Sequence, residues 1–185
     1  MLTLSRRFAL QATIGAAFAA VPLSRALSQP SSSTADAFSI MNSDPKFSDW
    51  VQILKFTGLA QYAASDQKFT AFIPTNAAFQ KYPAVLWNLK LSRSKAFPDT
   101  TSQVMFVRSH VVLDIHPLSE LGGKAATLTS IAGTPIMIDV PKPGVYDVTW
   151  VSINSQTAST RIISAPIMAS NAIIYPFDDV TLVMA

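Results

Sequence analysis

The chain has 185 residues, of which 14 are lysine or arginine and 11 are aspartate or glutamate, and it contains no cysteine. The missing cysteine excludes disulfides, thiolate metal ligands and a lipid-modified cysteine anchor. Three of the basic residues, Arg6, Arg7 and Arg25, lie in the first 28 positions, so the rest of the chain has 11 basic and 11 acidic residues. A near-neutral domain gives no reason to expect a nucleic-acid partner or direct binding to an anionic membrane.

The first 28 residues have the pattern of an export signal. Arg6 and Arg7 precede an uncharged, alanine-rich apolar run over residues 8–23. Small residues then allow cleavage after Ala26 or after Ser28. The paired arginines resemble a twin-arginine signal, which predicts a periplasmic or secreted protein. Two alternatives stay open: an ordinary secretory leader, or a leader retained as an anchor, although the apolar run is short for a span of about 20 residues.

Residues 29–37 are small and polar, which predicts a flexible tether before a single domain over residues 38–185. The first predicted helix begins at Asp44 and Pro45, which suit the N-cap and the first helical position. Gly58 is placed to end this helix. Its apolar face follows the helical repeat and consists of Phe47, Trp50, Val51 and Leu54.

The stretch from Phe69 to Phe79 is predicted to be the centre of the fold. Residues 69–73 alternate along an extended strand and are apolar on both sides, which indicates a strand buried on both faces. Pro74 should end the strand because it cannot donate to a sheet ladder. Thr75 and Asn76 then offer side-chain oxygens to cap a helix that begins at Ala77.

The second half of the chain favours a helix that includes Arg108, followed by short strands. Strands are expected at residues 127–129, 135–140 and 145–153, with a rigid proline turn at residues 141–144. Tyr146 and Trp150 lie on the third of these strands. Because aromatic residues often anchor partners, Tyr146, Trp150 and Lys142 are a candidate interaction surface; the alternative is that the hairpin packs its aromatics on its own sheet. A small basic cluster near Trp87 (Lys90, Arg93 and Lys95) is either a contact surface or a solvated loop.

Three segments, in the right order, resemble the fasciclin domain family. Pro74, Thr75, Asn76, Ala78 and Phe79 match its first signature, His110-Val111-Val112 its second, and residues 169–182 its third. The resemblance implies an α+β fold, a compact β-sandwich or wedge with helices packed along one side. It also implies a structural hydrogen bond between buried His110 and Asn76. Four positions depart from the family pattern: Ile73, Ser109 in place of tyrosine, Ala172 in place of glycine, and Tyr175 in place of histidine.

No residue pattern predicts catalysis, a metal site or a cofactor. His110 and His116 are six positions apart, a spacing without metal-ligand logic, and there is no nucleophile elbow. Ser109 is adjacent to His110 only in sequence, which does not create a nucleophile–base pair. Asp178 and Asp179 are neighbours on a strand and should point to opposite faces. The sequence therefore favours a protein that is not an enzyme.

Three functional hypotheses follow. The first is an exported adhesion or protein–protein interaction module, the role that the resemblance implies, with a polysaccharide as a further possible partner. The second is a small accessory subunit of a periplasmic membrane-bound oxidoreductase, such as a quinoprotein dehydrogenase, because the twin-arginine route exports folded proteins. In that case any membrane contact would be indirect, through the partner or a retained signal. The third is binding of a small apolar ligand between sheet and helices.

Overall fold

The computed structural model describes residues 33–81, 100–121, 123–151 and 157–179. Its helical elements, including the 3-10 turns labelled η, are α1 (Ala37–Ser43), η1 (Pro45–Phe47), α2 (Ser48–Phe56), α3 (Ala60–Ala63), α4 (Asn76–Lys81), α6 (Thr100–Ser109) and η2 (Leu118–Leu121). Its strands are β1 (Phe69–Pro74), β2 (Val111–Leu113), β3 (Ala126–Thr129), β4 (Pro135–Lys142), β5 (Val145–Val151), β6 (Thr157–Arg161), β7 (Ile167–Met168) and β8 (Ala172–Phe177).

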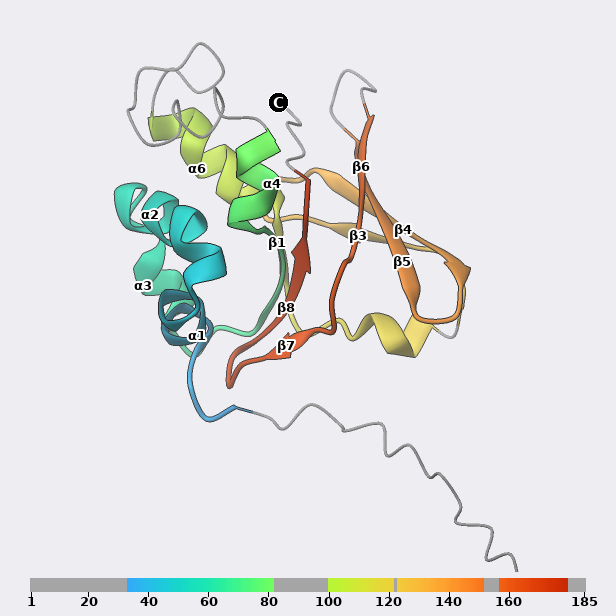
Figure 1. The fold of residues 1–185 in the computed structure, drawn as a ribbon, viewed down its shortest axis with the longest axis horizontal. Helices are drawn as coiled ribbons and strands as arrows, with labels where there is room; N and C mark the ends of the chain where they lie inside the picture. The colour runs from blue at the N-terminus through green and yellow to red at the C-terminus, as the bar shows by residue number, and fades with distance from the viewer. Residues whose placement is uncertain (1–32, 82–99, 122, 152–156, 180–185) are drawn as a thin grey trace, which may run out of the picture.

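The strands form two four-stranded sheets. The first, sheet A, has the order β2-β1-β8-β7, and the second, sheet B, has the order β3-β4-β5-β6. Sheet B is an antiparallel meander, whereas β1 and β8 at the centre of sheet A run parallel, from Phe69 opposite Ala172 to Pro74 opposite Phe177. Figure 1 shows the helices α1–α4 and α6 on one side of β1 and β8, and sheet B on the other. The predicted α+β sandwich with helices along one side is confirmed.

Sheet A therefore separates two apolar cores. Phe69, Ala71 and Ile73 of β1 belong to the core shared with the helices. Phe72 belongs to the core between the two sheets, together with residues of β4, β5 and β8. Every residue of β1 is buried, as the sequence predicted. A strand with apolar residues on both sides is stable here because each face meets its own layer.

The domain begins earlier than predicted. Asp36 caps α1 by accepting a hydrogen bond from the Ser39 amide at 2.8 Å, and Ala37 is fully buried. The backbone of Ser170 also donates to the Ala35 carbonyl at 2.9 Å. The end of the predicted tether, residues 33–37, is thus part of the folded domain. The reason is that Asp36 supplies an N-cap and Ala37 is small enough to fit beneath the last strand pair.

The predicted helix from Asp44 is divided into a 3-10 turn and a helix. Asp44 accepts from the Lys46 amide at 3.1 Å and Pro45 opens η1, after which α2 runs to Phe56. Gly58 has φ +72°, the left-handed conformation that ends helices at low cost. Ala172 is not among the described residues with positive φ, which explains how alanine can replace glycine there.

Candidate functional site

His110 lies at the junction of both cores and is fully buried. Four aromatic rings surround it, with ring-centroid distances of 4.5 Å to Phe106, 5.3 Å to Trp150, 5.6 Å to Trp50 and 5.8 Å to Phe177. Burial among these rings lowers the pKa of His110 to about 4, because the charged imidazolium cannot be hydrated there. The imidazole is accordingly neutral at neutral pH and has a structural role.

Ser109 and His110 do not form a nucleophile–base pair although their side chains are 3.1 Å apart. The Nδ1 atom of His110 lies 2.7 Å from the Phe106 carbonyl, which can only accept, so Nδ1 carries the proton in the neutral ring. The Ser109 hydroxyl donates to the same carbonyl at 2.7 Å. Since both side chains are also buried, this contact provides neither a base at Nδ1 nor access for a substrate.

The predicted hydrogen bond between Asn76 and His110 is wrong. The Asn76 Oδ1 atom accepts from the Asp49 amide at 3.1 Å, and its Nδ2 donates to the Pro45 carbonyl and the Ser48 hydroxyl, both at 2.8 Å. Asn76 therefore satisfies the beginning of α2 rather than its own helix. Thr75 takes the capping position of α4, with the Ala78 amide 3.4 Å from its hydroxyl. The amide of Asn76 is occupied by this neighbouring helix, so it is not directed to the histidine.

The predicted interaction surface of Tyr146, Trp150 and Lys142 does not exist as one surface. Lys142 is exposed and Tyr146 half-buried, but Trp150 is fully buried between the sheets, where its indole N–H donates to the Ser109 carbonyl at 3.0 Å. The alternation of β5 explains this placement. Asp147 lies on the opposite face of the strand, where Arg161 binds it through two hydrogen bonds of 2.6 and 2.9 Å.

Two residues of the last signature have roles that sequence reasoning missed. Asn171 is buried, accepts from the Ala37 amide at 2.8 Å, and donates to the carbonyls of Ala63 at 3.1 Å and Ser65 at 2.6 Å. Tyr175 accepts from the Leu118 amide at 2.7 Å. Burial raises the pKa of Tyr175 to about 12. The sequence did hold a signal for Asn171, because this asparagine directly precedes an apolar strand. Asparagine is rarely buried without specific hydrogen-bond partners.

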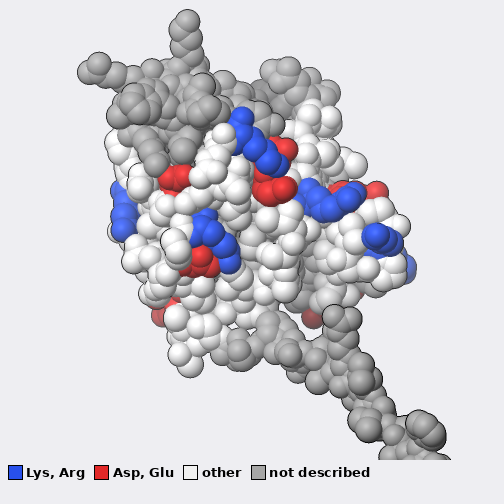
Figure 2. All heavy atoms as spheres, in the orientation of Figure 1, with Lys and Arg blue, Asp and Glu red and all other residues white. Residues whose placement is uncertain are grey.

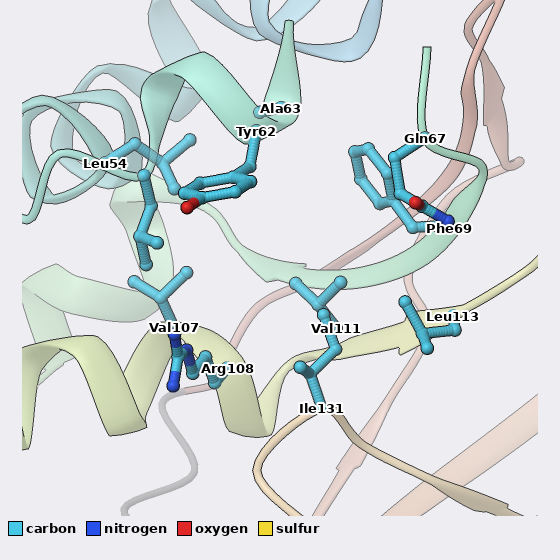
Figure 3. Close-up of a pocket in the computed structure, with 11 residues that line it drawn as sticks. Leu54, Tyr62, Ala63, Gln67, Phe69, Val107, Arg108, Val111, Leu113 and Ile131 are labelled. Carbon is cyan, nitrogen blue, oxygen red and sulfur yellow. The ribbon is translucent and has the colours of Figure 1, made fainter. Parts of the chain in front are cut away.

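An apolar groove of about 300 Å³ lies between the helices and the edge of sheet A. One wall comes from α2 and α3 and the segment after α3, and the other from the end of α6, from β2 and from the loop after β3. In Figure 3, Leu54 and Tyr62 lie on one side of this space, and Val107 and Val111 on the other. The complete lining is Leu54, Leu59, Tyr62, Ala63, Gln67, Phe69, Val107, Arg108, Val111, Leu113 and Ile131.

The groove brings together large apolar side chains that remain accessible to solvent. Tyr62 is 61% exposed, Leu113 51% and Ile131 45%. The polar groups that side chains contribute to the lining are those of Gln67 and Arg108 and the hydroxyl of Tyr62. Exposed single apolar residues are ordinary, but three of them around one concave apolar site are typical of a contact site. This is the candidate functional site, and it lies where the sequence allowed for a ligand between sheet and helices.

The face of the molecule drawn in Figure 2 carries charges of both signs. Figure 2 shows acidic and basic side chains close together in small groups on the visible face, without a broad patch of one sign. Within the described ranges, no group of three or more histidine, aspartate or glutamate side chains could hold a metal ion. No helix in these ranges is long and apolar enough to cross a membrane. Arg6, Arg7 and the predicted basic cluster of residues 90–95 beside Trp87 lie outside the described residues.

Comparison with known proteins agrees with this fold. The model of the fasciclin domain family matches residues 45–183. One similar solved structure is a FAS1 domain pair from the insect cell adhesion molecule fasciclin I, with a TM-score of 0.63 and 19% sequence identity. The match covers 80% of this chain and 50% of that one, so this chain spans about half the length of the insect structure. At this identity the likeness shows the fold alone.

A search of curated proteins finds no match. Family members are generally adhesion-type modules without catalytic activity. Because the family model matches well over half of the chain, this protein belongs to the fasciclin domain family.

Proposed function

We propose that this protein is an exported, non-catalytic module that binds a protein partner through the apolar groove. The single observation that carries the proposal is the exposure of Tyr62, Leu113 and Ile131 around one concave site. A partner that inserted an apolar side chain between them would remove their exposed area from water. Full burial of one such side chain contributes about 1.5–3 kcal/mol, so covering half of one contributes about 1 kcal/mol.

Leu113 offers a direct test, because it is half-exposed and lies on the edge strand β2. Leu113→Asp should weaken partner binding at least about tenfold, since a carboxylate in the groove must lose its hydration when the partner covers it. The measurement is quantitative mass spectrometry of envelope proteins retained by the immobilised mature domain. Met137→Asp is the matched control, because Met137 is 49% exposed against 51% for Leu113 and belongs to sheet B. Equal retention by the two variants would contradict the groove as the binding site.

The export part of the proposal depends on Arg6 and Arg7. A twin-arginine route requires the pair itself, whereas an ordinary secretory leader requires only positive charge before the apolar run. Replacing both arginines by lysine should therefore leave the protein in the cytoplasm, as read by fractionation and immunoblotting. Unchanged export of this double variant would favour the ordinary secretory leader instead.

The accessory-subunit hypothesis requires a stable companion such as a periplasmic dehydrogenase. Its expected contact around Tyr146 and Trp150 loses support because Trp150 is buried. No feature of the described residues favours an oxidoreductase over another protein partner. Co-elution of the native protein with a dehydrogenase in size-exclusion chromatography would support that hypothesis, and elution without a companion would count against it.

A further inference from the structure

We propose that the segment of the partner seated in the groove carries a carboxylate beside its apolar anchor, and that Arg108 receives this carboxylate. This inference rests on the proposed function and names the chemistry of the partner at the same site. The groove would then recognise an acidic-apolar segment rather than any apolar one.

Charge complementarity is the first argument. Arg108 is the only charged residue in the lining, and it is exposed. No ion pair of Arg108 is found among the described residues, although Asp147 and Arg161 show that bidentate pairing does occur in this domain. A guanidinium beside an apolar site attracts a carboxylate with a defined geometry, because its fork of N–H donors matches the two oxygens.

The fold fixes the backbone position of Arg108 relative to one apolar wall of the groove. Arg108 lies one residue before the end of α6, and its carbonyl accepts a hydrogen bond from the Ala132 amide at 3.3 Å. The preceding residue in that loop, Ile131, donates its amide to the Val111 carbonyl at 2.7 Å. The backbone of Arg108 and one apolar wall are therefore held by the same loop, which places the base of the cation next to this wall.

The groove recognises side chains rather than offering a free strand edge. The Val111 carbonyl of edge strand β2 is taken by Ile131, and the Leu113 carbonyl lies 2.9 Å from the Nε2 atom of His116. These occupied acceptors disfavour the addition of a partner strand to β2, which would need them for ladder hydrogen bonds. Specificity must then come from the apolar lining and from Arg108.

A random-peptide phage library selected against the immobilised domain tests this inference. Wild type should enrich peptides in which aspartate or glutamate stands close to leucine, isoleucine or an aromatic residue. Arg108→Glu should reverse the enrichment towards lysine and arginine. Lys124→Glu is the charge-matched control, because Lys124 is exposed outside the groove and should keep the wild-type preference. Adding Leu113→Asp to wild type or to Arg108→Glu should abolish the enrichment of acidic or of basic peptides, respectively.

The affinity of one enriched peptide gives a second readout. Arg108→Glu should weaken its binding at least about fivefold, because an exposed ion pair contributes up to about 1 kcal/mol and charge reversal adds repulsion. Wild-type affinity should fall with added salt, and the affinity of a peptide with the acid replaced by its amide should depend on salt much less. A salt-independent affinity would overturn the role of Arg108.

The remaining outcomes separate this inference from the proposed function. Apolar peptides that are lost in Leu113→Asp but show no acidic preference would overturn the inference and keep the groove as a protein site. The absence of any groove-dependent peptide would overturn both. Saturable binding of sodium dodecanoate without peptide binding would identify a lipid acid as the occupant, and a dimer that Leu113→Asp dissociates would identify a second copy. Either result would overturn the proposed peptide partner.

Discussion

His110 is a titratable ring that is fully buried where the two cores meet. Two polar groups contact its Nδ1 atom, the Phe106 carbonyl and the Ser109 hydroxyl, and four aromatic rings surround the imidazole. The neutral ring fits this site, whereas the imidazolium would be a charge that burial removes from water. The stability of the fold should therefore depend on pH through His110 between its ordinary pKa and its lowered pKa.

We expect wild-type stability to fall as the pH decreases from about 6.5 to about 4. The folded-state pKa of His110 lies below its ordinary value of 6.5, so the unfolded chain binds more protons in this interval. The contribution is fully present above 6.5 and is lost as the pH approaches 4. At about 1.4 kcal/mol per pKa unit, it amounts to about 3 kcal/mol. Urea unfolding at a series of pH values measures this loss.

Two variants assign the pH dependence. His110→Gln removes the titrating group, so its stability should vary much less with pH, although it should be lower than wild type at neutral pH. His116→Gln should keep the wild-type pH profile, because His116 is partly exposed and outside the aromatic cluster. A wild-type profile that stays flat between pH 6.5 and 4 would contradict the placement of His110.

At the residue scale, burial could be predicted where the sequence pattern was local. Hydrogen-bond partners could not be predicted where several groups competed for one side chain. The burial of His110 followed from the family resemblance. Its pairing with Asn76 was wrong because that asparagine instead binds a carbonyl of η1 and an amide and a hydroxyl of α2. For Trp150 the sequence left two interpretations open, a contact surface or packing on its own sheet, and the structure shows it packed in the core. Asp147 and Thr149 alternate with Val148 and Trp150, which places the aromatic ring inward.

At the scale of elements, the short helices depend on side chains from distant parts of the chain. Isolated helices as short as α1 and α3 are unstable in water because nucleation is costly. Asn171 links both: it accepts from the first residue of α1 and donates to carbonyls at and after the end of α3. The side-chain amide of Asn171, directly before β8, thus connects α1 and α3 to the central strand pair through hydrogen bonds.

Asn171→Ala should lower the free energy of unfolding by about 2–4 kcal/mol. The hydrogen bond from the Ala37 amide contributes about 1 kcal/mol, and the two carbonyls each lose a hydrogen bond of similar value. Asn171→Asp should be at least as destabilising, because its second oxygen would face the carbonyls of Ala63 and Ser65. Chemical denaturation measures both variants.

Asn42→Ala is the control for this element-scale prediction. Asn42 is exposed and accepts only from the Lys55 ammonium at 2.9 Å, so its loss should cost less than about 0.5 kcal/mol. An Asn171→Ala variant as stable as Asn42→Ala would contradict the linking role. The sequence could not assign this role, because the partners of Asn171 lie more than 100 positions away.

At the scale of the whole molecule, the groove arises from residues between positions 54 and 131 that only the fold brings together. Strand β1 was predictable because its two-sided apolar pattern is contiguous in the sequence. The groove has no such pattern: Leu113 and Ile131 look like ordinary strand or loop residues until α3 is placed opposite them. The sequence allowed for a site between sheet and helices, but it could not name the lining.

The most direct measurement of the central claim is photo-cross-linking in the native envelope. A benzophenone amino acid would replace Tyr62 in the groove or, as the control, Ile163, which is 50% exposed outside the groove lining. The account predicts a discrete protein adduct at position 62 that is lost on adding Leu113→Asp, and no such adduct at position 163. The same adducts from both positions, or none at position 62, would contradict the groove as the site of partner binding.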